Sequence, residues 1–244
     1  MNSLESRAGH LGTVLITGVS KRVGNALALE LQRSGYQVLG TYRTERDSLV
    51  NLRNDGVRLF QVDFYQDNAA TQLCEWVSSQ ATELRAIIHN ASDWLMEKNG
   101  VADDSTFQRM MTVHVQVPYV LNLSLEALLN AGDTPTDIIH FTDYVADTGS
   151  AKHIAYSASK AAMANMSLSF AKRFAPKIKV NSIAPALLQF NPDDSPGYRD
   201  KALTKSLLMK EGGLSEAVDT VNYILNSGYI TGRTLHLDGG RHLR

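Results

Sequence analysis

The fold of this chain is decided near its start, by the stretch Thr13–Gly24, which reads TVLITGVSKRVG. Its first part, Thr13–Thr17, is a short apolar run of the kind that forms a buried strand. Helical spacing follows over Val23–Ser34, and Gly35 then supplies the left-handed residue on which many helices end. The chain therefore begins with a strand, a sharp turn and a helix.

The same alternation of short apolar runs and longer helical segments continues along the chain. Further strands are predicted at Val38–Tyr42, Val57–Val62, Arg85–His89, Asp137–Thr142, Lys179–Ala184 and Thr234–Leu237. Helices are predicted at Arg46–Asp55, Asn68–Ser79, Ser105–Leu129, Ile154–Phe174 and Leu214–Asn226. Strands that are apolar at nearly every position belong in a parallel sheet covered on both faces. The pattern predicts an α/β fold, a single doubly wound Rossmann domain with a seven-stranded parallel sheet and helices on both faces.

The domain organisation follows from this regularity. The chain has 244 residues, a length that permits one or two domains. No linker rich in proline, glycine or serine interrupts the alternation, so residues 12–244 are predicted to form one domain after a flexible tail, Met1–Leu11. The least regular segment, at about 187–213, is predicted to be a mobile loop that meets the substrate.

Composition excludes several classes of function. Lysine and arginine number 24 against 25 aspartates and glutamates, so no excess of charge favours nucleic acid or a membrane surface. No apolar run reaches the roughly 18 residues that could span a membrane. The single cysteine, Cys74, cannot form an intramolecular disulfide, and neither it nor the scattered histidines show metal-ligand spacing. The composition predicts a cytoplasmic protein without a metal, whose partner is a small molecule.

The turn after the first strand is suited to binding a pyrophosphate. Gly18 allows the tight turn, and Gly24 lets the helix pack closely against the strand. Backbone amides around Lys21, Arg22 and Val23 can face the ligand, with the positive end of the helix dipole behind them. The turn therefore predicts a dinucleotide site.

The end of the second strand indicates which nicotinamide cofactor is used. An acidic residue there binds the ribose 2′-hydroxyl of NAD, whereas cations accept the 2′-phosphate of NADP. This chain has Arg43 and Thr44 at that point, and Arg22 lies in the first turn, although Glu45 favours the opposite choice. NADPH/NADP is therefore the predicted cofactor. Two residues after the third strand complete the predicted contacts, Asp63 for an adenine amine and Phe64 for the ring.

Tyr156 and Lys160 are candidate catalytic residues. They lie four residues apart in a predicted helix and so share one face. An ammonium group near a phenol stabilises the phenolate, which predicts that Lys160 lowers the pKa of Tyr156 below its ordinary value of about 10. The pair then predicts a tyrosine that exchanges a proton during catalysis.

With these motifs in order, the chain resembles the short-chain dehydrogenases/reductases over about Thr13 to Gly240. The resemblance rests on the glycine-rich turn, Asn90-Ala91-Ser92 after the fourth strand, Tyr156-x-x-x-Lys160, Val180-Asn181-Ser182-Ile183-Ala184-Pro185 and Leu237-Asp238-Gly239-Gly240. The family's usual catalytic serine lies 13 residues before the tyrosine, where this chain has Asp143. In that respect it resembles the pteridine reductase branch, which also has an arginine in the first turn and an aromatic residue at the position of Trp94. Within the branch it looks most like the bacterial dihydromonapterin reductases.

The resemblance implies an activity and a set of site residues. It implies NADPH-dependent reduction of a 7,8-dihydropterin, namely dihydromonapterin, dihydrobiopterin or dihydrofolate, with hydride reaching C6 and a proton reaching N5. Asp143, Tyr156 and Lys160 would be catalytic, and Ser92, Trp94, Asp143 and Tyr156 would contact the pterin. Asn90, Ala91, Ser92, Tyr156, Lys160, Pro185 and Leu187 would join the cofactor contacts. The family resemblance also implies a homotetramer, in which the segment Arg241–Arg244 approaches a neighbouring site.

Two alternatives and one departure stay open at this point. The first alternative is a carbonyl or 3-oxoacyl-type reductase of the same superfamily, in which Asp143 is only a loop cap. The second is a non-catalytic NADP-binding sensor, although Tyr156 and Lys160 are both present. The departure is His114, which occupies the position where the superfamily usually has a helix asparagine that holds a water relay.

Overall fold

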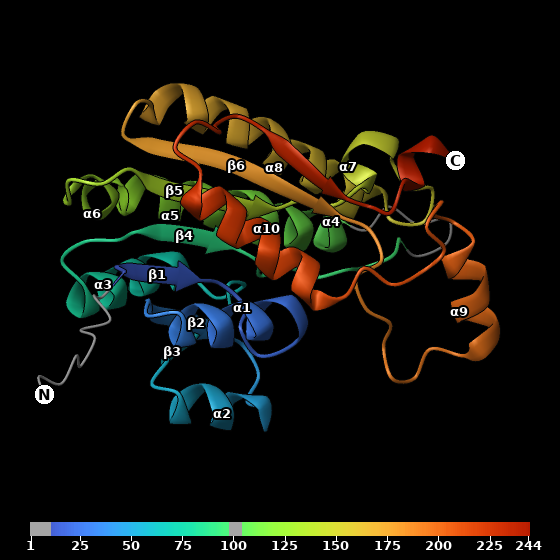
Figure 1. Cartoon of the computed structure of the whole chain (residues 1–244), viewed down its shortest axis with the longest axis horizontal. Helices are drawn as coiled ribbons and strands as arrows, with labels where there is room; N and C mark the ends of the chain where they lie inside the picture. The colour runs from blue at the N-terminus through green and yellow to red at the C-terminus, as the bar shows by residue number, and fades with distance from the viewer. Residues whose placement is uncertain (1–10, 98–103) are drawn as a thin grey trace, which may run out of the picture.

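The computed structural model describes residues 11–97 and 104–244, and its strands form one seven-stranded sheet (Figure 1). Neighbouring strands are parallel and lie in the order β3-β2-β1-β4-β5-β6-β7. The strands are β1 (Thr13–Ile16), β2 (Gln37–Tyr42), β3 (Arg58–Gln61), β4 (Ala86–His89), β5 (Thr136–Phe141), β6 (Ile178–Pro185) and β7 (Thr234–Leu237). The predicted seven-stranded parallel sheet is confirmed.

Helices cover both faces of this sheet (Figure 1). The described α-helices are α1 (Arg22–Arg33), α2 (Ser48–Asn54), α3 (Ala69–Gln80), α4 (Asp104–Met111), α5 (Val117–Ser124), α6 (Glu126–Asn130), α7 (Val145–Thr148), α8 (Ile154–Phe174), α9 (Pro196–Leu203) and α10 (Leu214–Asn226). Two short segments differ in type, the π-helical η1 (Thr112–Gln116) and the 3-10 helix η2 (Arg241–Leu243). Helices α1, α2 and α10 build the core on one face, and α3, α5 and α8 build it on the other.

The central strands explain why both faces are apolar. Ile16 and Ile88 pack into the core beneath α1 and α10, whereas their neighbours Leu15 and Ile87 pack into the core beneath α3, α5 and α8. All four side chains are fully buried. Because successive strand residues point to opposite faces, a sheet covered twice needs apolar residues at nearly every position.

The strand order reverses between β1 and β4, and this reversal positions the ligand site. From β1 the chain runs outward through β2 and β3, and from β4 it runs outward in the other direction. Ligands of open α/β sheets bind outside the carboxyl ends of the strands at such a point. Gly18 follows β1 and Asn90 follows β4, so both lie at this end of the sheet.

One predicted helix is interrupted. Instead of a continuous helix over Ser105–Leu129, the structure has α4, the π-helical η1, α5 and α6 in succession. Pro118 lies in the first turn of α5 and has no backbone N–H to donate to the preceding turn. The change of hydrogen-bond register at η1 precedes this proline and turns His114 inward, where it is fully buried.

The predicted substrate loop contains a helix that was not predicted, and its mobility stays a prediction. It contains α9, whose first residue is Pro196 and whose N-cap Ser195 accepts a hydrogen bond from the Tyr198 amide at 3.3 Å. Serine followed by proline is a recognised helix start, so this helix was within reach of sequence reasoning. The predicted flexible tail, Met1–Leu11, lies outside the described residues except for Leu11.

Neither a membrane-spanning helix nor a metal-binding cluster occurs among the described residues. Over residues 11–97 and 104–244, no helix is both long and apolar enough to cross a membrane. Within the same ranges, His, Cys, Asp and Glu side chains form no group of three or more that could hold a metal ion.

Candidate active site

The carboxyl ends of β1 and β4 are tied together around a single threonine hydroxyl. Thr17 Oγ1 accepts hydrogen bonds from the backbone amides of Asn90, at 3.1 Å, and Ala91, at 3.0 Å. The Asn90 side chain in turn donates to the carbonyl oxygen of Gly18 at 2.8 Å. The predicted cofactor residues Gly18, Asn90 and Ala91 therefore belong to one rigid corner of the site.

The glycines of the first turn are required by close backbone contacts. A Cβ atom on Gly24 would lie 2.1 Å from the Gly18 carbonyl oxygen and 2.4 Å from Asn90 Nδ2. Gly18 itself has a φ of +77°, which only glycine adopts without strain. Helix α1 starts with no acidic residue in its first turn, and its N-cap Lys21 provides no side-chain cap. The free amides of this helix start fit a pyrophosphate.

The two arginines that were predicted to meet the 2′-phosphate have different partners in the structure. The Arg22 guanidinium donates to Asn191 Oδ1 at 3.0 Å and to the Gln189 carbonyl, and so holds the substrate loop against the first turn. Arg43 pairs with Asp93 at 3.2 Å. Their joint contact with one phosphate stays a prediction.

The other predicted cofactor residues have mainly local contacts. Asp63 Oδ1 accepts from the Tyr65 amide at 3.2 Å, which makes this carboxylate a turn cap. Phe64 packs against the core of one sheet face, and Val23 packs against the core of the other. Thr44 is exposed. The structure leaves their contact with a dinucleotide as a prediction.

Asp143, Tyr156 and Lys160 come together beyond the end of β5. The Tyr156 hydroxyl donates to Asp143 Oδ2 at 2.8 Å, across 13 residues of chain. Lys160 lies one turn further along α8, with Nζ 5.6 Å from the centre of the Tyr156 ring. Its Nζ donates to the Phe141 carbonyl at 2.7 Å and is buried. The predicted catalytic residues therefore form one constellation.

Burial controls the protonation of this constellation. It raises the pKa of the Asp143 carboxyl, although the Val145 amide, Tyr156 and the Lys160 charge oppose the shift. Burial also lowers the pKa of Lys160 to about 8. Burial and the adjacent Asp143 charge raise the pKa of Tyr156 well above its ordinary value. Burial and a carboxylate in direct contact therefore dominate the pKa of Tyr156 in this structure, and its lowering by Lys160 together with a bound nicotinamide stays a prediction.

Trp94 is held close to the start of α8. Its indole stacks on the His153 ring with centroids 4.2 Å apart and lies 62% exposed. Glu97, three residues later, accepts from the amides of Ile154 and Ala155 at 2.9 and 2.6 Å, which caps α8. These contacts place an exposed aromatic surface on the same helix end as Tyr156.

His114 is a site residue whose role the sequence did not predict. Its Nε2 lies 2.8 Å from the Ser92 hydroxyl and its Nδ1 lies 2.8 Å from the Ser159 hydroxyl. Its ring meets the Tyr156 ring edge to face, with centroids 5.4 Å apart. Ser92 opposes the rise in the pKa of the Tyr156 hydroxyl, which places the two side chains near one another. The only signal in the sequence was the departure from the usual asparagine.

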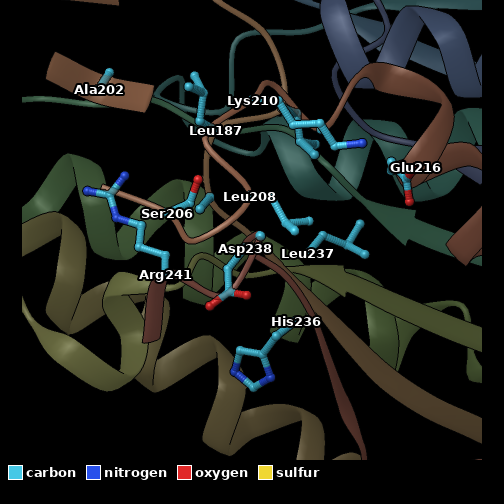
Figure 2. A pocket seen from close by; sticks show the side chains of 14 residues that line it. Leu187, Ala202, Ser206, Leu208, Lys210, Glu216, His236, Leu237, Asp238 and Arg241 are labelled. Atoms are coloured by element: carbon cyan, nitrogen blue, oxygen red, sulfur yellow. The ribbon is translucent and has the colours of Figure 1, made fainter. Parts of the chain in front are cut away.

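A recess of about 220 Å³ lies between the substrate loop and the C-terminal segment. Figure 2 shows Arg241 and Ser206 at the left, Lys210 and Glu216 at the upper right, and Asp238 and His236 below them. Of the predicted site residues only Leu187 lines the recess. Arg241 connects it to the catalytic constellation, because its guanidinium lies 4.0 Å from the centre of the ring of Tyr144, the neighbour of Asp143.

The chain is similar to known proteins over most of its length. The family model described as enoyl-(acyl carrier protein) reductase matches residues 18–242. Dihydromonapterin reductase of Klebsiella pneumoniae is 48% identical over 232 residues, which are 95% of this chain and 97% of that protein. The chain belongs to the short-chain dehydrogenase/reductase family. As a member of this family it is an NADPH-dependent oxidoreductase.

Other members of the short-chain dehydrogenase/reductase family are similar over the whole chain. Dihydromonapterin reductase of Escherichia coli K12 is 47% identical and aligns with 95% of this chain and 97% of its own length. Among solved structures, FolM alternative dihydrofolate reductase 1 of Brucella canis, complexed with NADP, superposes with a TM-score of 0.87. It is 26% identical, and the superposition covers 98% of this chain and 97% of that one.

Proposed function

We propose that this short-chain dehydrogenase/reductase reduces a 7,8-dihydropterin to the tetrahydropterin. Dihydromonapterin is the first candidate substrate, and dihydrobiopterin and dihydrofolate are the others. The observation that carries the proposal is the 2.8 Å hydrogen bond from Tyr156 to Asp143. Asp143 occupies the position where the family usually has a serine. The names of the Klebsiella and Brucella proteins support the same substrate class.

A carboxyl group beside the tyrosine suits a pterin better than a ketone. The pterin ring presents an aminopyrimidine edge whose N–H groups can donate to a carboxylate, and a C=N bond that needs a proton on nitrogen. A ketone offers only an acceptor oxygen. Asp143 could therefore accept two N–H groups of the ring through its two oxygens and also take part in proton transfer, whereas a serine hydroxyl has a single oxygen and does not ionise near neutral pH.

The residues of the site divide the work as follows. Bound NADPH supplies the hydride that reduces C6. The raised pKa of Tyr156 keeps its hydroxyl protonated at neutral pH, so the hydrogen-bonded pair of Tyr156 and Asp143 could deliver this proton to N5 directly or through water. Lys160 would contact the nicotinamide ribose, and Trp94 would cover the pterin face. Holding the reacting atoms about 3–3.5 Å apart then accounts for much of the rate.

Initial rates with purified enzyme test this proposal. Oxidation of NADPH is followed with each of the three dihydropterins and with a panel of small ketones, and the measurements are repeated with NADH. We expect pterin turnover with a preference for NADPH. Asp143→Ser is expected to lose pterin turnover, and unchanged pterin rates together with gained ketone reduction would instead support a carbonyl reductase.

We further propose that the enzyme is a homotetramer, as the family resemblance implies. In the structure of one chain, Arg241 already contacts Tyr144 of the same chain, so the C-terminal segment reaches its own site. Light scattering on the purified protein measures the mass directly, and a monomeric mass would contradict the proposal.

A further inference from the structure

A chain of hydrogen bonds leads from the exposed hydroxyl of Ser92 into the protein. Ser92 contacts Nε2 of the buried His114 at 2.8 Å, and Nδ1 of the same ring contacts Ser159 at 2.8 Å. The Ser159 hydroxyl donates to the backbone carbonyl of Tyr156 at 2.7 Å. Four groups from three separate segments are thus connected in series.

The last link determines the direction of every other one. A carbonyl oxygen can only accept, so the single proton of Ser159 points to the Tyr156 carbonyl and its oxygen is an acceptor toward His114. Nδ1 of His114 must therefore carry a proton. Burial, assisted by the Lys160 charge, lowers the pKa of His114 well below its ordinary value, so the ring is neutral and Nε2 has a free lone pair. The Ser92 hydroxyl has a second acceptor in the Asp93 carbonyl at 3.4 Å, but Nε2 of His114 is nearer at 2.8 Å, so the hydroxyl donates to Nε2.

The same chain is unsuited to proton relay. It ends on a backbone carbonyl, which neither supplies nor stores a proton, so no proton from solvent can travel along it to Tyr156. Its effect is instead to orient Ser92. Once the only Ser92 proton is used on His114, the exposed side of this oxygen presents lone pairs alone.

We propose that His114 is a positioning residue that holds Ser92 as a hydrogen-bond acceptor beside Tyr156, and that this selects substrates with a ring or amino N–H at that point. The inference rests on the proposed function, because a dihydropterin is a substrate of this kind. Asp143 is a second acceptor on the other side of the Tyr156 hydroxyl. Two acceptors around one hydroxyl favour a ring rich in N–H groups and disfavour a ketone, whose oxygen can only accept.

The tautomer of His114 can be measured without any activity. In ¹⁵N-labelled full-length enzyme, the nitrogen chemical shifts distinguish a protonated from an unprotonated ring nitrogen, and His114→Gln assigns the signals. We expect a neutral ring with protonated Nδ1 and unprotonated Nε2. A protonated Nε2 would overturn the proposal, since Ser92 would then be free to donate to the substrate.

The helix offers a matched pair of kinetic variants. Ser159→Ala removes the acceptor of the His114 Nδ1 proton, whereas Ser167→Ala removes the equivalent 2.8 Å contact to Nδ1 of His140, two turns further along α8. We expect Ser159→Ala to raise KM for the dihydropterin about tenfold, the equivalent of one hydrogen bond, with KM for NADPH unchanged.

The outcomes distinguish a failure of the positioning role of His114 from a failure of the proposed function. Ser167→Ala is expected to leave both KM values as in the wild type, so equal behaviour of the two variants would refute a positioning role for His114. If the wild-type enzyme turns over no dihydropterin, the proposed function fails and the substrate selection falls with it. The tautomer of His114 is still decided by the nitrogen spectrum in that case.

Discussion

Acidification from pH 7.5 to 5 is expected to destabilise the protein through His89, a fully buried histidine at the end of β4. Its Nε2 lies 2.7 Å from Asn122 Oδ1, an oxygen that can only accept, so Nε2 carries the proton. Its Nδ1 has no hydrogen-bond partner within the described part of the chain. The ring stacks on that of His140 at 4.8 Å. A second proton on His89 would therefore be buried without an acceptor.

The size of the effect follows from the pKa. Burial lowers the pKa of His89 to about 4, against an ordinary value of 6.5 that applies to the unfolded chain. Below pH 6.5 His89 binds a proton in the unfolded chain but stays neutral in the folded protein. Its contribution to the free energy of unfolding is therefore fully present above pH 6.5 and is lost as the pH falls. At pH 5 this difference in the His89 pKa lowers the free energy of unfolding by about 2 kcal/mol, and below pH 4 the loss levels off at ~3 kcal/mol.

Urea unfolding of the wild type and of His89→Gln at pH 7.5 and at pH 5 measures the contribution of His89 to this loss of stability. Glutamine retains an N–H for Asn122 but does not titrate, so we expect the loss of unfolding free energy on acidification to shrink by about 2 kcal/mol. His236→Gln alters an exposed histidine that contacts the Asp147 carboxylate at 2.9 Å, and it is expected not to reduce the loss. If His89→Gln loses as much stability as the wild type between the two pH values, the assigned pKa and the reasoning from it are wrong.

Three further predictions concern the site. Gly24→Ala is expected to abolish NADPH binding in calorimetry, because the new Cβ would lie 2.1 Å from the Gly18 carbonyl oxygen; normal affinity would contradict this. Asp143→Asn is expected to lower kcat for a dihydropterin by about 100-fold in initial-rate assays, because the amide that replaces the carboxylate beside Tyr156 cannot exchange a proton; a kcat equal to that of the wild type would contradict this. Arg241→Ala removes a cation that lies 4.0 Å from the Tyr144 ring, an interaction of about 1 kcal/mol. Because Tyr144 is the neighbour of Asp143, we expect KM for the dihydropterin to rise roughly fivefold in initial-rate assays.

The fold class and the order of the motifs could be predicted from the sequence because they depend on local periodicity. Apolar runs such as Ala86–His89 identify buried strands without knowledge of their neighbours, and glycine spacing after β1 marks the turn that starts α1. Tyr156 and Lys160 share a face simply because they are four residues apart in a helix. The π-helical turn before Pro118 was missed, because single residues seldom reveal a change of hydrogen-bond register.

Partners and protonation were decided only by the tertiary structure. Arg43 looked free to meet a phosphate, yet the fold sets Asp93 against it from a segment fifty residues away. The pKa of Tyr156 moves upward because burial and Asp143 act on it together, and neither can be read from the spacing of Tyr156 and Lys160. His114 has a defined tautomer only because the segment after β4, η1 and α8 bring Ser92, the His114 ring and Ser159 within hydrogen-bonding distance. Hydrogen-bond partners, protonation states and tautomers depend on atoms that are distant in the sequence and become neighbours only when the chain folds.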